Sequence, residues 1–187
     1  MELVPQSMAA TRVTGQPCHV STTSPELRTL YALDMTEERG VAALEESGIA
    51  YTLTRHGPVA GLEEAAAARG VDPSAIIKTL VVRRAAEDYL FVLVPGGRTI
   101  SWPKLRALLG VSRISMPDAA TAREVTGYER GTITPFGSTT TWPVVADATV
   151  TGTVSIGAGA PGVAALVDAA ELVDRLGAQV ADVTEPD

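Results

Sequence analysis

The chain has 187 residues and a formal net charge of −7, and its 45% hydrophobic and 20% charged residues are ordinary for one globular domain. No segment approaches the ~18 consecutive apolar residues that a membrane span needs, and the N-terminal segment lacks the apolar stretch of a secretion signal. The single cysteine, Cys18, excludes an internal disulfide. We therefore expect a cytoplasmic protein that does not enter a membrane.

The N-terminal part of the sequence differs from the rest. Residues 1–35 are rich in Ser, Thr, Pro and small residues and show no apolar period, which predicts a loosely ordered tail. Thr36 is a good N-cap residue, and the two glutamates after it suit the first turn of a helix. A helix is expected to begin there and to end at Gly48, so the compact domain is predicted to span residues 36–187.

Predicted strands and helices are interleaved along this domain. Strands are indicated by β-branched and aliphatic runs, and helices by capped or Ala-rich segments that end at glycine. The expected strands cover residues 49–55, 76–84, 88–94, 112–116 and 144–149, and the expected helices cover residues 62–70, 101–110 and 117–126. Because the spacers are irregular and several strands are adjacent in sequence, the pattern predicts an α/β (α+β) fold with a mixed sheet surrounded by helices.

A glycine pattern near the C-terminus allows two interpretations. G-x-G-x-x-G is the fingerprint of dinucleotide-binding loops, and here it is formed by Gly157, Gly159 and Gly162. Asp182, twenty residues after the last glycine, stands about where a ribose-binding acid would lie. However, Asp168 and Glu171 form a D-x-x-E capping box, so a helix is expected to start only near residue 169. This favours a glycine hairpin between two strands over a dinucleotide-dependent oxidoreductase.

Most standard catalytic motifs are missing from the sequence. There is no G-x-S-x-G elbow, no phosphate-binding G-x-x-x-x-G-K-[ST] loop, no C-x-x-C and no H-E-x-x-H. His19, His56 and Cys18 do not have metal-ligand spacing, so no metal site is expected. His56 is interpreted as a strand-end residue that makes a backbone hydrogen bond.

Two features remain as candidates for chemistry. Lys78 begins an apolar strand in a chain that has thirteen arginines and only one other lysine, Lys104. The segment GTITP, residues 131–135, lies in a long loop before a buried strand, and long loops in compact domains are more often functional than idle. Each feature also has a purely structural explanation. Lys78 could be a strand-end lysine that extends to water, and residues 131–135 could be a plain connection whose Gly and Pro only set turns.

The charge is unevenly distributed along the chain. Seven Lys or Arg residues and only two acids lie between Ile76 and Arg113, which gives this window a charge of +5 and the remainder −12. Such a local basic face could bind a short piece of RNA backbone. A solvated strand face is the simpler explanation of the charge alone.

Five segments, in this order, resemble the YbaK/prolyl-tRNA-editing-domain family. They are KTLV at 78–81, LVPGGRTISWPKLRALLG at 93–110, GYERGTITPFG at 127–137, GAGAPG at 157–162 and LVDRLGAQVADV at 172–183. The resemblance covers residues 37–184. It implies a compact α/β domain with a mixed sheet and a metal-free, cofactor-free hydrolase that removes wrong amino acids from tRNA, most often tRNA(Pro).

The resemblance also assigns site residues. It places Lys78 beside the aminoacyl ester and the terminal adenosine, as the catalytic residue. The residues implied in substrate binding are Thr79, Gly131, Thr132, Ile133, Thr134, Pro135, Gly157 and Gly159. Some relatives that remove cysteine carry Ser at the position of Gly157 and a GISP version of the loop, so the preference between cysteine and alanine stays open.

The predicted task suits such a site. A prolyl pocket cannot strongly exclude smaller amino acids, because one methylene is worth only ~1–3 kcal/mol. An aminoacyl ester is already activated, so positioning and carbonyl polarisation suffice, with water or a substrate thiol as nucleophile. We expect a trans-editing deacylase of Cys- or Ala-tRNA(Pro), whose partners are the acceptor end of tRNA and a prolyl-tRNA synthetase. The alternative is a non-catalytic module that binds tRNA or a synthetase.

Overall fold

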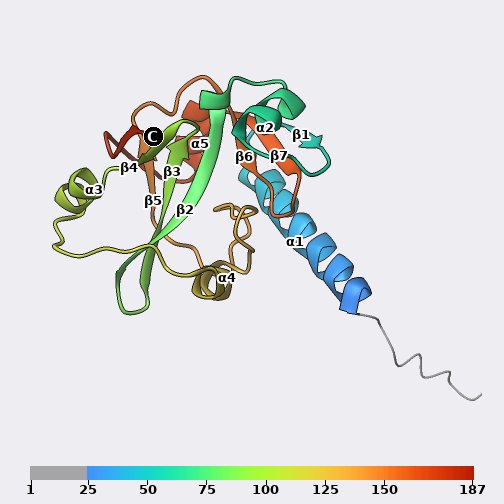
Figure 1. Ribbon diagram of the computed structural model, residues 1–187, viewed down its shortest axis with the longest axis horizontal. Coiled ribbons are helices and arrows are strands. Elements are labelled where there is room, and N and C mark those ends of the chain that lie inside the picture. The colour runs from blue at the N-terminus through green and yellow to red at the C-terminus, as the bar shows by residue number, and fades with distance from the viewer. Residues whose placement is uncertain (1–24) are drawn as a thin grey trace, which may run out of the picture.

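The fold is built on a seven-stranded mixed sheet (Figure 1). The computed structural model describes the backbone of residues 25–187 and the side chains of residues 35–187. The strand order is β1-β7-β6-β2-β3-β5-β8. The strands are β1 (Tyr51–Arg55), β2 (Ile76–Ala85), β3 (Asp88–Pro95), β5 (Val144–Asp147), β6 (Thr153–Gly157), β7 (Val163–Asp168) and β8 (Gln179–Ala181).

The sheet contains both antiparallel and parallel strand pairs. β1, β7 and β6 pair antiparallel in turn, as do β2 and β3, whereas β2 with β6, β3 with β5 and β5 with β8 are parallel. A second, two-stranded sheet joins β4 (Arg98–Ile100) to β9 (Thr184–Pro186). The predicted mixed sheet is therefore confirmed.

Helices cover both faces of the sheet. They are α1 (Pro25–Ser47), α2 (Leu62–Arg69), the 3-10 helix η1 (Pro73–Ala75), α3 (Trp102–Leu109), α4 (Ala119–Thr126) and α5 (Ala169–Arg175). Leu44 of α1, Ala122 of α4 and Leu172 of α5 belong to the larger core, and Leu105 of α3 belongs to a second core. Figure 1 shows α1 projecting away from the sheet and α3 lying at the opposite end. In the described part of the chain, no helix combines the length and apolarity needed to cross a membrane.

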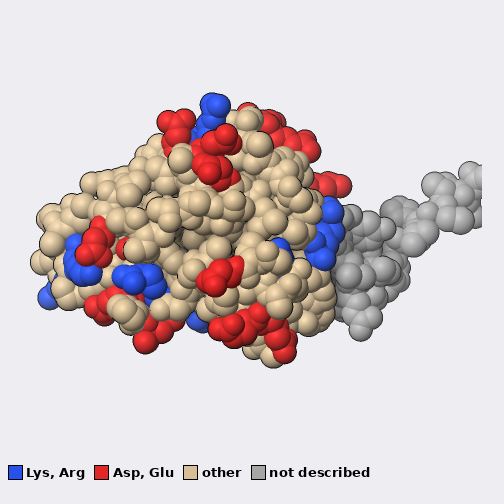
Figure 2. All heavy atoms as spheres, turned by 90° about the horizontal axis from the view of Figure 1, so that it is seen from above, with Lys and Arg blue, Asp and Glu red and all other residues tan. Residues whose placement is uncertain are grey.

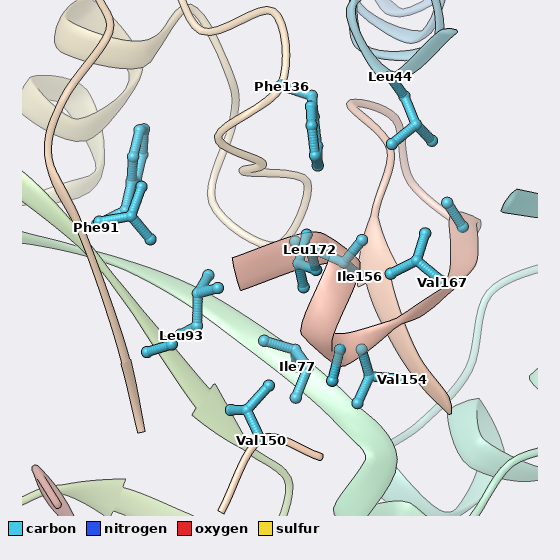
Figure 3. Packing of buried hydrophobic residues seen from close by; sticks show 14 of the residues in the cluster. Leu44, Ile77, Phe91, Leu93, Phe136, Val150, Val154, Ile156, Val167 and Leu172 are labelled. Carbon is cyan, nitrogen blue, oxygen red and sulfur yellow. The ribbon is translucent and has the colours of Figure 1, made fainter. Parts of the chain in front are cut away.

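The larger core joins elements that are distant in sequence. Figure 3 shows Leu44, Ile77, Leu93, Ile156 and Leu172 directed toward one another from helix and strand, and all five are buried. Burying side chains of this size stabilises the fold by about 1.5–3 kcal/mol each. The strand β2 supplies Ile77 to this core and Val82 to the second core, so it is fixed from both faces.

Two expected elements are wrong in the structure. The helix expected from Thr36 begins at Pro25, where a proline suits the first turn, and Thr36 lies inside it. Residues 1–24 of the expected tail lie outside the described residues. The expected strand 112–116 is reduced to one bridge, in which Ser115 exchanges two backbone hydrogen bonds with Arg83. Pro117 lacks the N–H that would be needed to extend this bridge into a ladder.

The glycine pattern at 157–162 forms a hairpin. β6 and β7 pair antiparallel from Thr153↔Asp168 to Gly157↔Ala164, on either side of these glycines. The next helix begins only at Ala169, where the Asp168 carboxylate caps it by accepting from the backbone N–H groups of residues 170 and 171. The predicted hairpin is confirmed. The dinucleotide interpretation is wrong, because its third glycine must open a helix that holds the pyrophosphate.

Candidate active site

A cleft opens where β2 and β6 separate. These parallel strands pair only at Ile76↔Ser155 and Ile77↔Ile156. Beyond these pairs β2 continues beside β3, and the space on its other side is a cleft of about 580 Å³. Its walls come from β2, from residues 116–119, from the 130–133 part of the long loop and from the β6–β7 hairpin.

The cleft brings together five of the nine predicted site residues. Those that line it are Lys78, Thr79, Gly131, Ile133 and Gly157. Those that do not line it are Thr132, Thr134, Pro135 and Gly159. Strand β2 and the long loop, which are distant in sequence, thus meet across one hollow.

Two loop threonines shape the loop from inside. The hydroxyl of Thr132 donates to the carbonyl oxygen of Glu129 at 2.9 Å, and both threonine side chains are buried. The hydroxyl of Thr134 accepts the Phe136 N–H at 3.4 Å. The loop is closed by Tyr128, whose hydroxyl donates to the Phe136 carbonyl at 2.8 Å. With the Thr132, Thr134 and Tyr128 hydroxyls bonded within the loop, the loop presents Gly131 and Ile133 to the cleft.

The two hairpin glycines have different surroundings. A Cβ on Gly157 would lie 3.4 Å from the carbonyl oxygen of Ile133, an ordinary contact distance. Gly159 has φ +94°, and a Cβ there would lie 2.4 Å from the carbonyl oxygen of Thr36 on α1. Gly157 therefore forms part of the cleft wall beside the loop, whereas Gly159 allows the hairpin to pack against α1.

Lys78 lies at the cleft with its ammonium group anchored. Its Nζ donates to the carbonyl oxygen of Arg98 at 2.5 Å and lies 3.8 Å from a carboxylate oxygen of Asp187. The side chain remains 36% exposed. An ammonium has three N–H donors, and within the described residues only one of these has a hydrogen-bond acceptor. The other two donors have no hydrogen-bond acceptor among the described residues, and the Asp187 carboxylate balances the charge from 3.8 Å.

Thr79 offers an unsatisfied hydroxyl at the cleft. The residue is only 8% exposed, and its Oγ1 has no hydrogen-bond partner among the described residues. An unpaired buried hydroxyl costs about 1–3 kcal/mol, so such a group is unusual in a native protein unless a ligand completes it.

Two arginines at the cleft were missed in the sequence analysis. Arg69 donates through Nε to His56 Nε2 at 3.1 Å and reaches Ser155 Oγ at 3.4 Å, and burial lowers the pKa of its guanidinium. No acid pairs with Arg69 or Arg130 within the described region. Arg69 ends an Ala-rich helix, where a cation suits the helix dipole, so the sequence offered a sufficient structural reason for it. His56 makes the predicted backbone contact, with Nδ1 2.7 Å from the Gly57 carbonyl oxygen.

The cleft is electropositive on an acidic protein. Its cations are Arg69, Lys78 and Arg130, and its one acid is Asp118. The Asp118 carboxylate caps α4 by accepting the Thr121 N–H at 2.8 Å, and that hydrogen bond lowers its pKa. On the face shown in Figure 2, by contrast, acidic side chains form most of the charged clusters. Residues 35–187 contain no group of three His, Cys, Asp or Glu residues that could hold a metal ion.

A family model for the aminoacyl-tRNA editing domain matches residues 56–175, and the chain belongs to this family. The matched range contains every predicted site residue.

Individual relatives agree with this assignment. The proline–tRNA ligase of Bacillus licheniformis is 30% identical over 129 residues, which cover 68% of this chain and 22% of that enzyme. The chain thus spans about a fifth of this relative. A solved protein proposed to be a trans-editing enzyme for prolyl-tRNA synthetase has a TM-score of 0.73 and 26% identity, covering 88% of this chain and 99% of its own. The hypothetical protein APE2540 has a TM-score of 0.71 and 29% identity, covering 79% and 99%.

Proposed function

We propose that this protein is a trans-editing deacylase that hydrolyses the ester of mischarged aminoacyl-tRNA, with Cys- or Ala-tRNA(Pro) as its substrate, in the cytoplasm. The observation that carries the proposal is the meeting of Lys78, Thr79 and the 131–133 backbone at one cleft. Its volume of about 580 Å³ falls within the range of small-molecule sites and suits an aminoacylated adenosine. Membership of the editing-domain family supports the same activity.

Positioning of the substrate follows from the cleft walls. The ammonium of Lys78 would bind the ester carbonyl or the terminal phosphate through its other two donors. The unpaired hydroxyl of Thr79 would form a hydrogen bond with a polar group of the aminoacyl adenosine. The loop backbone beside Gly131 and Ile133 would hold the α-amino group, and the Ile133 carbonyl, which faces Gly157 across the cleft wall, would limit the room for large side chains.

The hydrolysis itself needs little from the protein. A water oxygen attacks the ester carbonyl carbon, and the negative charge that develops on the carbonyl oxygen is stabilised by the Lys78 ammonium. The bond from the carbonyl carbon to the ribose oxygen then breaks, and a proton from the attacking water passes to that ribose oxygen. For a cysteinyl ester the substrate thiol can attack the carbonyl carbon in place of water; the bond to the ribose oxygen breaks, the thiol proton passes to that oxygen, and the amino acid leaves as a cyclic thioester. Positioning of an already activated ester is the main contribution of the site.

The partners of the reaction would be the acceptor end of the tRNA and a prolyl-tRNA synthetase, whose mistakes the protein would correct. The relationship to part of a proline–tRNA ligase supports this partnership. The aminoacylation site of a synthetase cannot reject a smaller amino acid efficiently, because one methylene contributes too little binding free energy. Removing the wrong amino acid after aminoacylation supplies the missing selectivity.

The two lysines of the chain provide a matched test. Lys104 pairs with Asp182 at 2.8 Å and donates to the Thr184 carbonyl, away from the cleft. We expect Lys78→Ala to lower deacylation of Ala-tRNA(Pro) or Cys-tRNA(Pro) by about 100-fold, because the oxyanion loses its cation. Lys104→Ala should hydrolyse these substrates like the wild-type protein. Single-turnover release of labelled amino acid measures the rate, and circular dichroism checks that both variants are folded.

Equal rates for Lys78→Ala and the wild-type protein would overturn the assignment of Lys78. A wild-type protein that binds tRNA but hydrolyses no aminoacyl ester from a panel of Cys-, Ala- and Ser-tRNA(Pro) would overturn the proposed activity, and would favour a non-catalytic module of the same fold.

A further inference from the structure

A second concave site lies beyond the cleft, at the far end of β2. This site, the arginine groove, has a volume of about 550 Å³ and lies between the β2–β3 hairpin, the end of α3 and residues 112–115. Its charged lining consists of Arg83, Arg84, Arg106 and Arg113. No acidic residue lines it.

Most of this positive charge is not compensated. Arg84 pairs with Asp88 at 2.7 Å. The other three arginines form no ion pair with any described residue, although Arg83 is near enough to Asp118 to help lower the pKa of that carboxyl group. Three unpaired guanidinium groups in one hollow favour a ligand with several negative charges.

Backbone hydrogen bonds join the segments that carry these arginines. Arg83 and Ser115 exchange backbone hydrogen bonds of 2.8 and 3.1 Å, which join the segment after α3 to β2. The Arg106 carbonyl accepts the Val111 N–H at 3.2 Å at the end of α3. The charges therefore converge from a strand, a helix and a connecting segment. A solvated face of one strand, the simpler explanation of the basic window, does not account for this convergence.

We propose that the arginine groove binds the phosphate backbone of the unpaired 3′ end of tRNA while its terminal ester occupies the cleft. The proposal rests on the proposed function for the position of the ester. Both sites lie along β2: Thr79 borders the cleft and Arg83 borders the groove. Four residues of strand span about 13 Å, which corresponds to roughly four nucleotide steps at a stacked spacing of 3.4 Å.

The chemistry of the groove matches this ligand. Arginine binds phosphate through two parallel N–H donors, a geometry that lysine cannot reproduce. The groove contains no lysine and no aromatic side chain, so it is suited to backbone phosphates and not to stacked bases. A strand of RNA that leaves the cleft along β2 would place successive phosphates beside these arginines.

Binding of RNA without an amino acid tests the groove separately from catalysis. The probe is a labelled, uncharged RNA hairpin with a four-nucleotide single-stranded 3′ end, bound to the full chain over a range of salt concentrations. Arg83→Gln/Arg113→Gln should bind about ten-fold more weakly than the wild-type protein, and the slope of log affinity against log salt should fall by about 1.4, because two phosphate contacts are lost. Arg175→Gln is the control, since Arg175 is also exposed and unpaired among the described residues but lies on α5. It should bind the hairpin like the wild-type protein.

A second probe locates the contact. For adenosine monophosphate the wild-type protein and the double variant should bind equally, since this ligand has no phosphate four steps from its ribose. Equal hairpin affinity and salt slope for the double variant and Arg175→Gln would overturn the proposal, and so would the absence of hairpin binding by the wild-type protein. Because no ester is present in either probe, a protein that binds the hairpin through these arginines but hydrolyses no ester would retain the groove and lose the proposed activity.

Discussion

Thr79 combines a structural cost with a location at the cleft. Its hydroxyl is buried without a partner, while the methyl group and backbone occupy a well-packed strand. A residue selected only for stability would be valine, which has the same shape and needs no hydrogen bond. Under the proposed function, a ligand that supplies the missing partner would explain the presence of threonine.

Thr79→Val tests this explanation by moving stability and activity in opposite directions. We expect the free energy of unfolding to rise by about 1 kcal/mol, because an unsatisfied buried hydroxyl is removed. Deacylation should fall by about ten-fold in kcat/KM, through loss of one hydrogen bond to substrate. Urea unfolding and steady-state kinetics measure the two quantities. A variant that loses both stability and activity would show that the hydroxyl has a structural partner.

For individual residues, the sequence motifs predicted part of the cleft lining. Lys78, Thr79, Gly131, Ile133 and Gly157 were predicted through resemblance to the editing domains, and the structure brings them together. Arg69 and Arg130 could not be found in this way, because their proximity to Lys78 depends on the packing of α2 and the long loop around β2. Local sequence carries no record of that packing.

Among the elements, the β6–β7 hairpin carries two glycines with different roles. One is required by the backbone conformation, and the other borders the cleft. Gly159 combines positive φ with a close approach to the Thr36 carbonyl, and Gly157 has neither restriction. Substitution by alanine at these two positions, which are only two residues apart, therefore tests different properties.

Gly159→Ala should destabilise the protein by about 2 kcal/mol or more, because alanine disfavours this φ and its methyl group collides with backbone. Gly157→Ala should stay within about 1 kcal/mol of the wild-type protein. Its methyl group should leave hydrolysis of Cys-tRNA(Pro) and Ala-tRNA(Pro) close to the wild-type rates, because relatives with the larger Ser at this position still remove cysteine. Thermal unfolding and paired deacylation rates measure these effects. Equal stability of the two variants would contradict the distinction.

Capping signals predicted the ends of the helices and, apart from α1, most of their starts. Gly70, Gly110 and Gly127 end their helices in the left-handed conformation, as expected from their positions. The start of α1 was missed even though Leu27, Leu30 and Tyr31 have helical spacing and Pro25 precedes them. The three-residue strands β4, β8 and β9 are too short for any period to be recognised. Their pairing is decided by the tertiary structure.

At the scale of the whole molecule, one buried carboxylate connects distant parts of the chain. Asp147, at the end of β5, is 1% exposed and accepts N–H groups from Thr149 at 3.0 Å and Val183 at 3.1 Å. Burial alone would raise its pKa, but hydrogen bonds from Thr149, Thr184 and Val183 outweigh burial and hold the pKa below its ordinary value. The C-terminal segment is thereby attached to the central sheet.

The lowered pKa of Asp147 predicts that the stability of the fold decreases at acid pH. Because its pKa is lower in the folded state, its stabilising contribution is present above the unfolded pKa of about 3.9 and is lost as pH falls through the lower, folded pKa. Asp147→Asn should lose about 3 kcal/mol at pH 7, where an amide cannot replace the charged acceptor, and should show a smaller further loss below pH 4. Urea midpoints between pH 7 and pH 2.5 measure both effects. Asp174→Asn, at an exposed position on α5, should behave like the wild-type protein.

The divergence of β2 from β6 after two residue pairs has a consequence for how such a domain can evolve. Because the divergence of two backbones opens the hollow, exchanging a side chain that borders it leaves this backbone frame in place. Substitutions along its rim can alter which amino acid is admitted while leaving the sheet intact. A few substitutions in one fold could then produce editing domains with different amino-acid specificity. The residues that determine folding and those that determine selectivity would be largely separate.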